Sequence, residues 1–181
     1  MTLTLIPRGL AAAAILAAAA AMTGCAVAPS TPAAMAPESV KTVHQHPASV
    51  SVIAPTSKEP NAAGKGIVTD AAVVDAVVAS IEKTKTFSRV VKGAGADYQL
   101  SVVLMSADLP AFGMSFTCKT EMAWSLKKTD GTAVWQEVLK SEGTAGAGEA
   151  FAGTERAKMA MERSVRENIA QGLAKVSGLS L

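Results

Sequence analysis

The stretch SFTCKTEMAWSLK, residues 115–127, decides the fold class. Apolar and polar residues alternate along it, which is the period of a β-strand with one face toward a core and the other toward solvent. The apolar side carries Phe116, Cys118, Met122, Trp124 and Leu126. Asp130-Gly131 follows and is a strong hairpin signal, so a second strand is predicted over residues 133–141.

The length of the hairpin turn decides which residues share the face of Trp124. A two-residue turn places Trp135 and Leu139 on that face, whereas a three-residue loop with its glycine in the left-handed conformation places Val134 and Val138 there. The sequence leaves both registers open.

The segments around this hairpin complete the domain. Valines recur at helical spacing after Thr69 and Asp70, either of which can cap the helix, and a long amphipathic helix closes the chain from Thr154 to a stop at Gly178. Three further strand patterns cover residues 50–54, 87–91 and 98–105. The order β-α-β-β-β-β-α predicts an α+β fold: a two-layer sandwich of a largely antiparallel sheet with two helices on one face.

The first 24 residues have the layout of a bacterial signal peptide. Arg8 precedes an apolar run over residues 10–22 that is shorter than the roughly 20 residues needed to span a bilayer. The run ends in Met22-Thr23-Gly24-Cys25, which resembles the lipobox of bacterial lipoproteins. The resemblance implies cleavage before Cys25, a diacylglycerol on its sulfur and an acyl chain on its new amine. Ala26, in place of the aspartate of inner-membrane members, implies sorting to the outer membrane.

Residues 25–48 are rich in proline and have no apolar period, which predicts a disordered, flexible tether ahead of a periplasmic domain over residues 49–181. Such a tether would reach roughly 25 Å on average and at most about 70 Å. The only two histidines, His44 and His46, fall within it. We expect them to be solvated and not to bind metal, because a flexible segment brings no further ligands together.

The composition argues against an enzyme and against a nucleic-acid partner. With 17 basic and 15 acidic residues, the chain has no broad basic footprint. Residues 49–181 contain no histidine to activate a serine or cysteine. Cys118 is in phase with Phe116, so we expect it to be buried, and Phe151 stands where a dinucleotide fingerprint needs its third glycine. No catalytic, cofactor-binding or metal-binding residue is therefore expected.

One loop is a candidate binding site. Residues 108–114 join two predicted strands and carry Leu109, Phe112 and Met114, which could form a docking patch for a partner. The favoured interpretation is instead that Phe112 and Met114 fold back over the edge of the sheet.

The overall layout resembles the small outer-membrane lipoproteins of the YajG type. The resemblance rests on Cys25, the tether, the strand ending near Leu104-Met105, the Asp130-Gly131 hairpin and the closing sequence over residues 148–155. More distantly, the element order resembles the periplasmic domains of penicillin-binding-protein activators and lipopolysaccharide-assembly lipoproteins. These relatives imply an accessory binding role without catalytic residues, so only the lipidation of Cys25 is transferred.

We therefore expect a non-enzymatic lipoprotein on the periplasmic face of the bacterial outer membrane, where it binds another envelope protein. The acyl chains on Cys25 would be its only attached groups, and its oligomeric state is left open. The alternative is a periplasmic carrier or sensor for an apolar small ligand held between sheet and helices.

Overall fold

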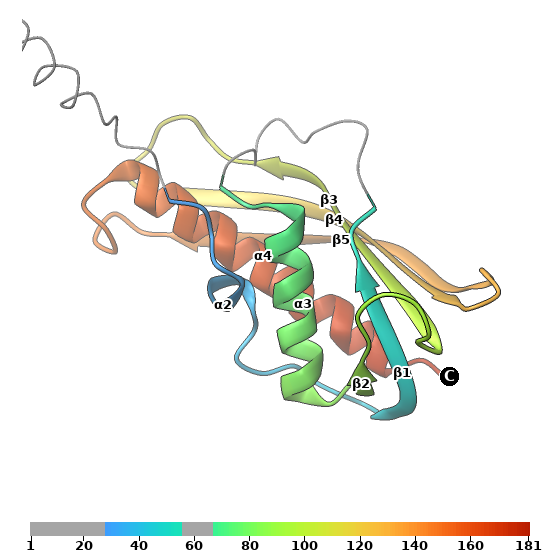
Figure 1. Cartoon of the computed structure of the whole chain (residues 1–181). Helices are drawn as coiled ribbons and strands as arrows, with labels where there is room; N and C mark the ends of the chain where they lie inside the picture. The colour runs from blue at the N-terminus through green and yellow to red at the C-terminus, as the bar shows by residue number, and fades with distance from the viewer. Residues whose placement is uncertain (1–27, 56–66) are drawn as a thin grey trace, which may run out of the picture.

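The computed structural model describes residues 28–55 and 67–181, so the predicted signal peptide and Cys25 lie outside it. Its elements are α2 (Pro32–Met35), β1 (His46–Ile53), α3 (Asp70–Thr84), β2 (Phe87–Val90), β3 (Tyr98–Asp108), β4 (Phe116–Lys128), β5 (Ala133–Ala145) and α4 (Gly153–Ser177). The strands form one sheet in the order β2-β1-β3-β4-β5, and α3 and α4 lie against one of its faces (Figure 1). The predicted α+β sandwich is confirmed.

The sheet is mixed rather than largely antiparallel. Strands β3, β4 and β5 pair antiparallel in chain order, as hairpin-linked strands do. Strand β1 is inserted between β2 and β3 and runs parallel to both of them. Parallel neighbours need a crossover connection, which α3 provides between β1 and β2.

The β4–β5 hairpin combines features of both predicted registers. Its loop contains three residues, 129–131, with Gly131 at φ +86°, and the Lys128 amide donates to the Thr132 carbonyl at 2.9 Å. A shift of register then follows, because Lys127 pairs with Ala133 whereas Leu126 pairs with Trp135. This bulge shifts the pairing by one residue and gives the arrangement predicted for a two-residue turn. Trp135 and Leu139 therefore lie on the same face of the sheet as Trp124.

The predicted tether is wrong for residues 28–48, which pack against the domain. Thr31 caps the one-turn helix α2 through its side chain, and Pro32 lies in the first turn, where its missing N–H costs nothing. Met35 is completely buried in the core, and the carbonyl of Ala34 accepts hydrogen bonds from the guanidinium of Arg166 in α4. Proline-rich composition here reflects a tight turn rather than a free chain.

The end of this N-terminal segment is also fixed. His46 is the first residue of β1 and is buried, with Nε2 2.9 Å from the Val176 carbonyl and its ring 5.2 Å from the ring of Phe87. The amide of His44 donates to the Ser177 carbonyl. His46 is thus a structural core residue and not a solvated one.

Two of the three predicted helix ends are confirmed. Thr69 caps α3 by accepting from the Ala72 amide at 3.2 Å, and Gly178 ends α4. The predicted cap by Thr154 is wrong: the N-cap is Ala152, two residues earlier, and it makes no side-chain cap hydrogen bond. Other side chains fix this end of the helix, as described below.

Helix α4 lies unusually close to β4 and β5. A Cβ atom on Gly143 of β5 would lie 2.2 Å from the backbone nitrogen of Ser164, and one on Gly172 of α4 would lie 2.4 Å from the indole of Trp124. Both distances are far below van der Waals contact, so only glycine fits at either position. The interface between α4 and the sheet is therefore filled.

Buried polar side chains cross the same interface. The Trp124 indole N–H donates to Asn168 Oδ1 at 2.9 Å, and Asn168 Nδ2 donates to the Leu139 carbonyl at 2.9 Å. Ser141 and Ser164 each donate from Oγ to the other's carbonyl, at 2.8 and 3.0 Å. Every partner is buried, so these bonds fix the position of the helix along the strands.

Candidate binding surfaces

The β3–β4 loop exposes two of the three residues predicted there. Phe112 is 91% exposed and Met114 is 78% exposed, whereas Leu109 is partly buried against the core. The favoured interpretation, that Phe112 and Met114 fold back over the sheet edge, is therefore wrong. Phe116, the first residue of β4, is buried at this end of the sheet, and its ring lies against Gly153.

The β5–α4 loop adds a third large apolar residue, Phe151. In the sequence analysis this residue served only to exclude a dinucleotide fingerprint, and it was not expected to be part of a surface. Phe151 is fully exposed. Both loops leave the same end of the sheet, because Phe116 pairs with Ala145 (Figure 1). An open hollow of about 490 Å³ at this end is lined by residues 109–111 of the β3–β4 loop and by Gly153 and Thr154 at the start of α4. We call Phe112, Met114 and Phe151 the apical patch.

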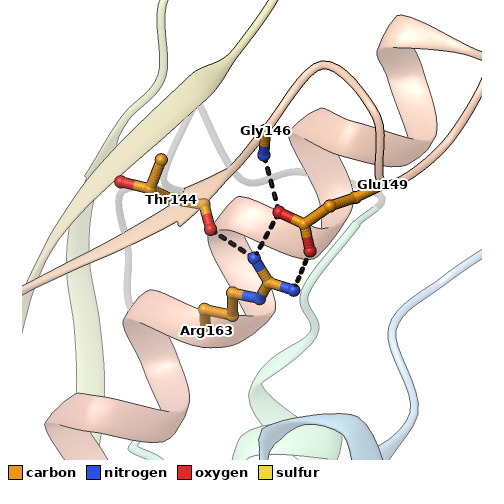
Figure 2. A network of polar contacts seen from close by, with 4 residues as sticks. All are labelled: Thr144, Gly146, Glu149 and Arg163. Atoms are coloured by element: carbon orange, nitrogen blue, oxygen red, sulfur yellow. Dashed lines mark hydrogen bonds and ion pairs between the residues drawn. The ribbon is translucent and has the colours of Figure 1, made fainter.

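A salt bridge fixes the β5–α4 loop to α4. Figure 2 shows Glu149 accepting from the Gly146 amide at 2.7 Å and bonding through both of its oxygens to the guanidinium of Arg163, which also donates to the Thr144 carbonyl. The hydrogen bond from Arg163 is the largest cause that lowers the pKa of Glu149 to about 2, and the Gly146 amide adds to it. The loop therefore has a defined conformation at neutral pH.

Arg156 fixes the rest of the loop. Its Nη1 donates to the carbonyls of Ala150 and Phe151, at 2.6 and 2.9 Å. Its guanidinium carbon lies 5.9 Å from the centre of the Phe116 ring, in cation–π geometry. Phe151 is thus held outward by a backbone that is bonded on both sides of it.

The described part of the chain contains little that could do chemistry. No three His, Cys, Asp or Glu side chains within residues 28–55 and 67–181 are placed to hold a metal ion. Cys118 is fully buried as predicted, and burial raises the pKa of its thiol to about 11. It is protonated at neutral pH and is a poor nucleophile. None of the helices in these two ranges is both long and apolar enough to cross a bilayer.

The face of the sheet opposite the helices is a second candidate surface. Val103, Ala123 and Val138 are cross-strand neighbours that form an apolar row over β3, β4 and β5. They line a shallow hollow of about 410 Å³ together with Ser101, Ser125 and Gln136. Two exposed cross-strand ion pairs lie on one side of the row, Lys119 with Glu142 at 3.3 Å and Lys140 with Glu121 at 2.7 Å.

Comparison with known proteins shows the fold alone. No known family matches the sequence, and no curated protein matches it either. The structure is similar to protein XCC0632 from Xanthomonas campestris, of family DUF330, with TM-score 0.57 and 17% identity over 83% of this chain and 94% of that one. It is also similar to protein CT253 from Chlamydia trachomatis, with TM-score 0.57 and 9% identity over 73% and 96% of the two chains. A minor lipoprotein from Acinetobacter baumannii matches more weakly, with TM-score 0.45, 8% identity, and 75% and 92% covered. The chain thus shares its architecture with bacterial proteins of very different sequence.

Proposed function

We propose that the protein is a non-enzymatic lipoprotein of the bacterial envelope that acts as an accessory binding module for another envelope protein. Acyl chains on Cys25 would attach it to the periplasmic face of the outer membrane. The lipobox resemblance supports the attachment, and two or three acyl chains suffice for a stable anchor. The buried thiol of Cys118 and the pairing of Glu149 with Arg163 leave neither residue free for catalysis.

The uncovered sheet face carries the binding part of the proposal. An apolar centre surrounded by charged and polar residues is the usual anatomy of a protein–protein contact. Here the centre is the row of Val103, Ala123 and Val138, and the surround includes the ion pairs of Lys119 and Lys140. We propose this face as the surface for the protein partner.

The geometry favours a binding module over a carrier of apolar ligands. A ligand between sheet and helices would have to separate α4 from β4 and β5. At Gly143 and Gly172 that interface has no room even for one methyl group. The two hollows described above lie at the surface and are open to solvent.

Site-specific photo-crosslinking in living cells tests the partner surface. A photoreactive amino acid at Val138, on the uncovered face, is expected to capture one envelope protein, and capture should weaken when Cys25→Ser removes the anchor. The matched control is Glu82, which is exposed on α3. Equal capture at both positions, or none at Val138, would refute the surface. The intact mass of the purified protein tests the anchor separately, because Cys25→Ser should lack the acyl chains.

A further inference from the structure

We propose that the apical patch, formed by Phe112, Met114 and Phe151, contacts the lipid bilayer to which the chain is attached. The inference rests on the proposed lipidation of Cys25. The sequence analysis considered Phe112 and Met114 as a docking patch for a protein, whereas this proposal gives them the lipid bilayer as partner. Three observations support it: where the chain enters the domain, how short the attachment is, and how the patch is presented.

The chain enters the domain at the end that bears the patch. The Ser30 amide donates to the Ile67 carbonyl at 2.6 Å, just before the start of α3. From there α3 leads away to β2, where Phe87 pairs with His46 beside the C-terminal end of α4. The start of the described chain, at residue 28, therefore lies toward the opposite end of the domain, where α4 begins and the apical loops lie (Figure 1).

The attachment is much shorter than a 24-residue tether. Ser30 is bonded to the domain and lies five residues after Cys25. Five residues span at most about 18 Å when fully extended. A lipidated Cys25 would therefore keep this end of the domain close to the headgroups, whereas the predicted tether would have held the domain clear of them.

The patch has the chemistry and rigidity that suit a bilayer surface. Phenylalanine and methionine gain free energy when they leave water, and aromatic residues are favoured at the interface between lipid and water. Arg156 and the Glu149–Arg163 pair already hold the backbone around Phe151, so ordering that loop on binding costs little. The patch can thus act as a second, weak contact that orients the anchored domain.

Depth-dependent fluorescence quenching tests the contact in the full mature lipoprotein. The protein would be reconstituted into vesicles of phosphatidylethanolamine and phosphatidylglycerol, with brominated lipid as quencher. Phe112→Trp and Phe151→Trp are the probes. Val43→Trp is the control, because Val43 is 60% exposed and its amide bonds Ser177 at the far end of α4. Trp124 and Trp135 give the same background in every variant.

The added tryptophans at positions 112 and 151 are expected to be blue-shifted and quenched at least about twofold more than the one at position 43. Quenching no stronger than at position 43 would overturn the proposal. Capture of a protein by a photoreactive group at position 112, with no quenching by lipid, would overturn it too and assign the patch to a protein partner.

A second measurement separates this proposal from the lipidation of Cys25. Cys25→Ser protein would carry no acyl chains, so its binding to vesicles reports on the surface of the domain alone. The double change Phe112→Ser/Phe151→Ser is expected to lower that binding about tenfold or more. Unchanged binding would refute the patch, whereas an absence of acyl chains on the parent protein would refute the anchor alone.

Discussion

Replacing Gly143 by alanine tests how closely α4 packs on the sheet. The new Cβ would lie 2.2 Å from the backbone nitrogen of Ser164 and 2.4 Å from the backbone carbonyl oxygen of Ala160. Backbone atoms of a helix cannot rotate away as the end of a long side chain can. The helix as a whole must therefore move away from β5.

The required movement sets the size of the effect. Bringing the closest contact to 3.0 Å, the shortest that real Cβ atoms show, requires the two elements to separate by about 0.8 Å. The bonds of Ser164 to Thr120 and Ser141 are 2.8 to 3.0 Å long, and the same movement would lengthen them to or beyond the hydrogen-bonding limit. Losing three buried bonds at about 1 kcal/mol each, with residual overpacking, predicts a destabilisation of about 3–5 kcal/mol.

Urea unfolding of Cys25→Ser protein, followed by the emission of buried Trp124, measures this change in the free energy of unfolding. Gly148→Ala is the control, because a Cβ atom added at Gly148 would meet nothing within 4 Å and should change stability by less than about 0.5 kcal/mol. In a Ser164→Ala background the cost of Gly143→Ala should fall by about 2 kcal/mol, since the two bonds made by the Ser164 hydroxyl are already absent. A cost below about 0.5 kcal/mol for Gly143→Ala would refute the close packing.

Three further predictions concern single side chains. Asn168→Ala leaves the buried indole N–H of Trp124 without its partner and is expected to lower the free energy of unfolding by about 2–4 kcal/mol in urea titrations; a loss under about 0.5 kcal/mol would contradict the bond. Cys118, with its thiol pKa raised to about 11, should resist alkylation at pH 8 until urea unfolds the protein, and labelling of the folded protein would show that it is accessible. The pKa of Glu149 is lowered from 4.5 to about 2, so its stabilising contribution is complete above pH 4.5 and is lost as the pH falls through about 2. The amide resonance of its partner Gly146 should titrate with a midpoint near 2, and a midpoint near 4.5 would refute the pairing.

The sequence predicts the elements of this fold well because local periodicity determines them. The alternation from Phe116 to Leu126 and the helical spacing after Thr69 both correspond to elements that the structure contains. The position of β1 between two parallel neighbours depends on pairings between residues far apart in the chain. No local sequence pattern indicates such pairings, so the mixed sheet could not be predicted from the sequence.

The binding surfaces were harder to predict for a related reason. Phe112 is exposed and Phe116 is buried at the same end of the sheet, a difference that depends on how the loop packs and not on the hydrophobicity of either residue. Phe151 points outward because Arg156, five residues later, bonds the carbonyl of Phe151. The N-terminal segment has the composition of a coil, yet Met35 finds a buried site that tertiary structure creates. In each case the deciding contact comes from the assembled domain.

The attachment of the N-terminal segment to the last helix also determines when the domain can fold. Ala34 and His46 bond Arg166 and Val176, partners that lie 132 and 130 residues further along the chain. Contacts of such high sequence separation close only after α4 has been made, and they slow folding because a long loop must be ordered first. A chain still emerging from a ribosome or a translocation channel would lack these contacts. Its first segment would stay open to proteases and to chaperones until α4 arrives.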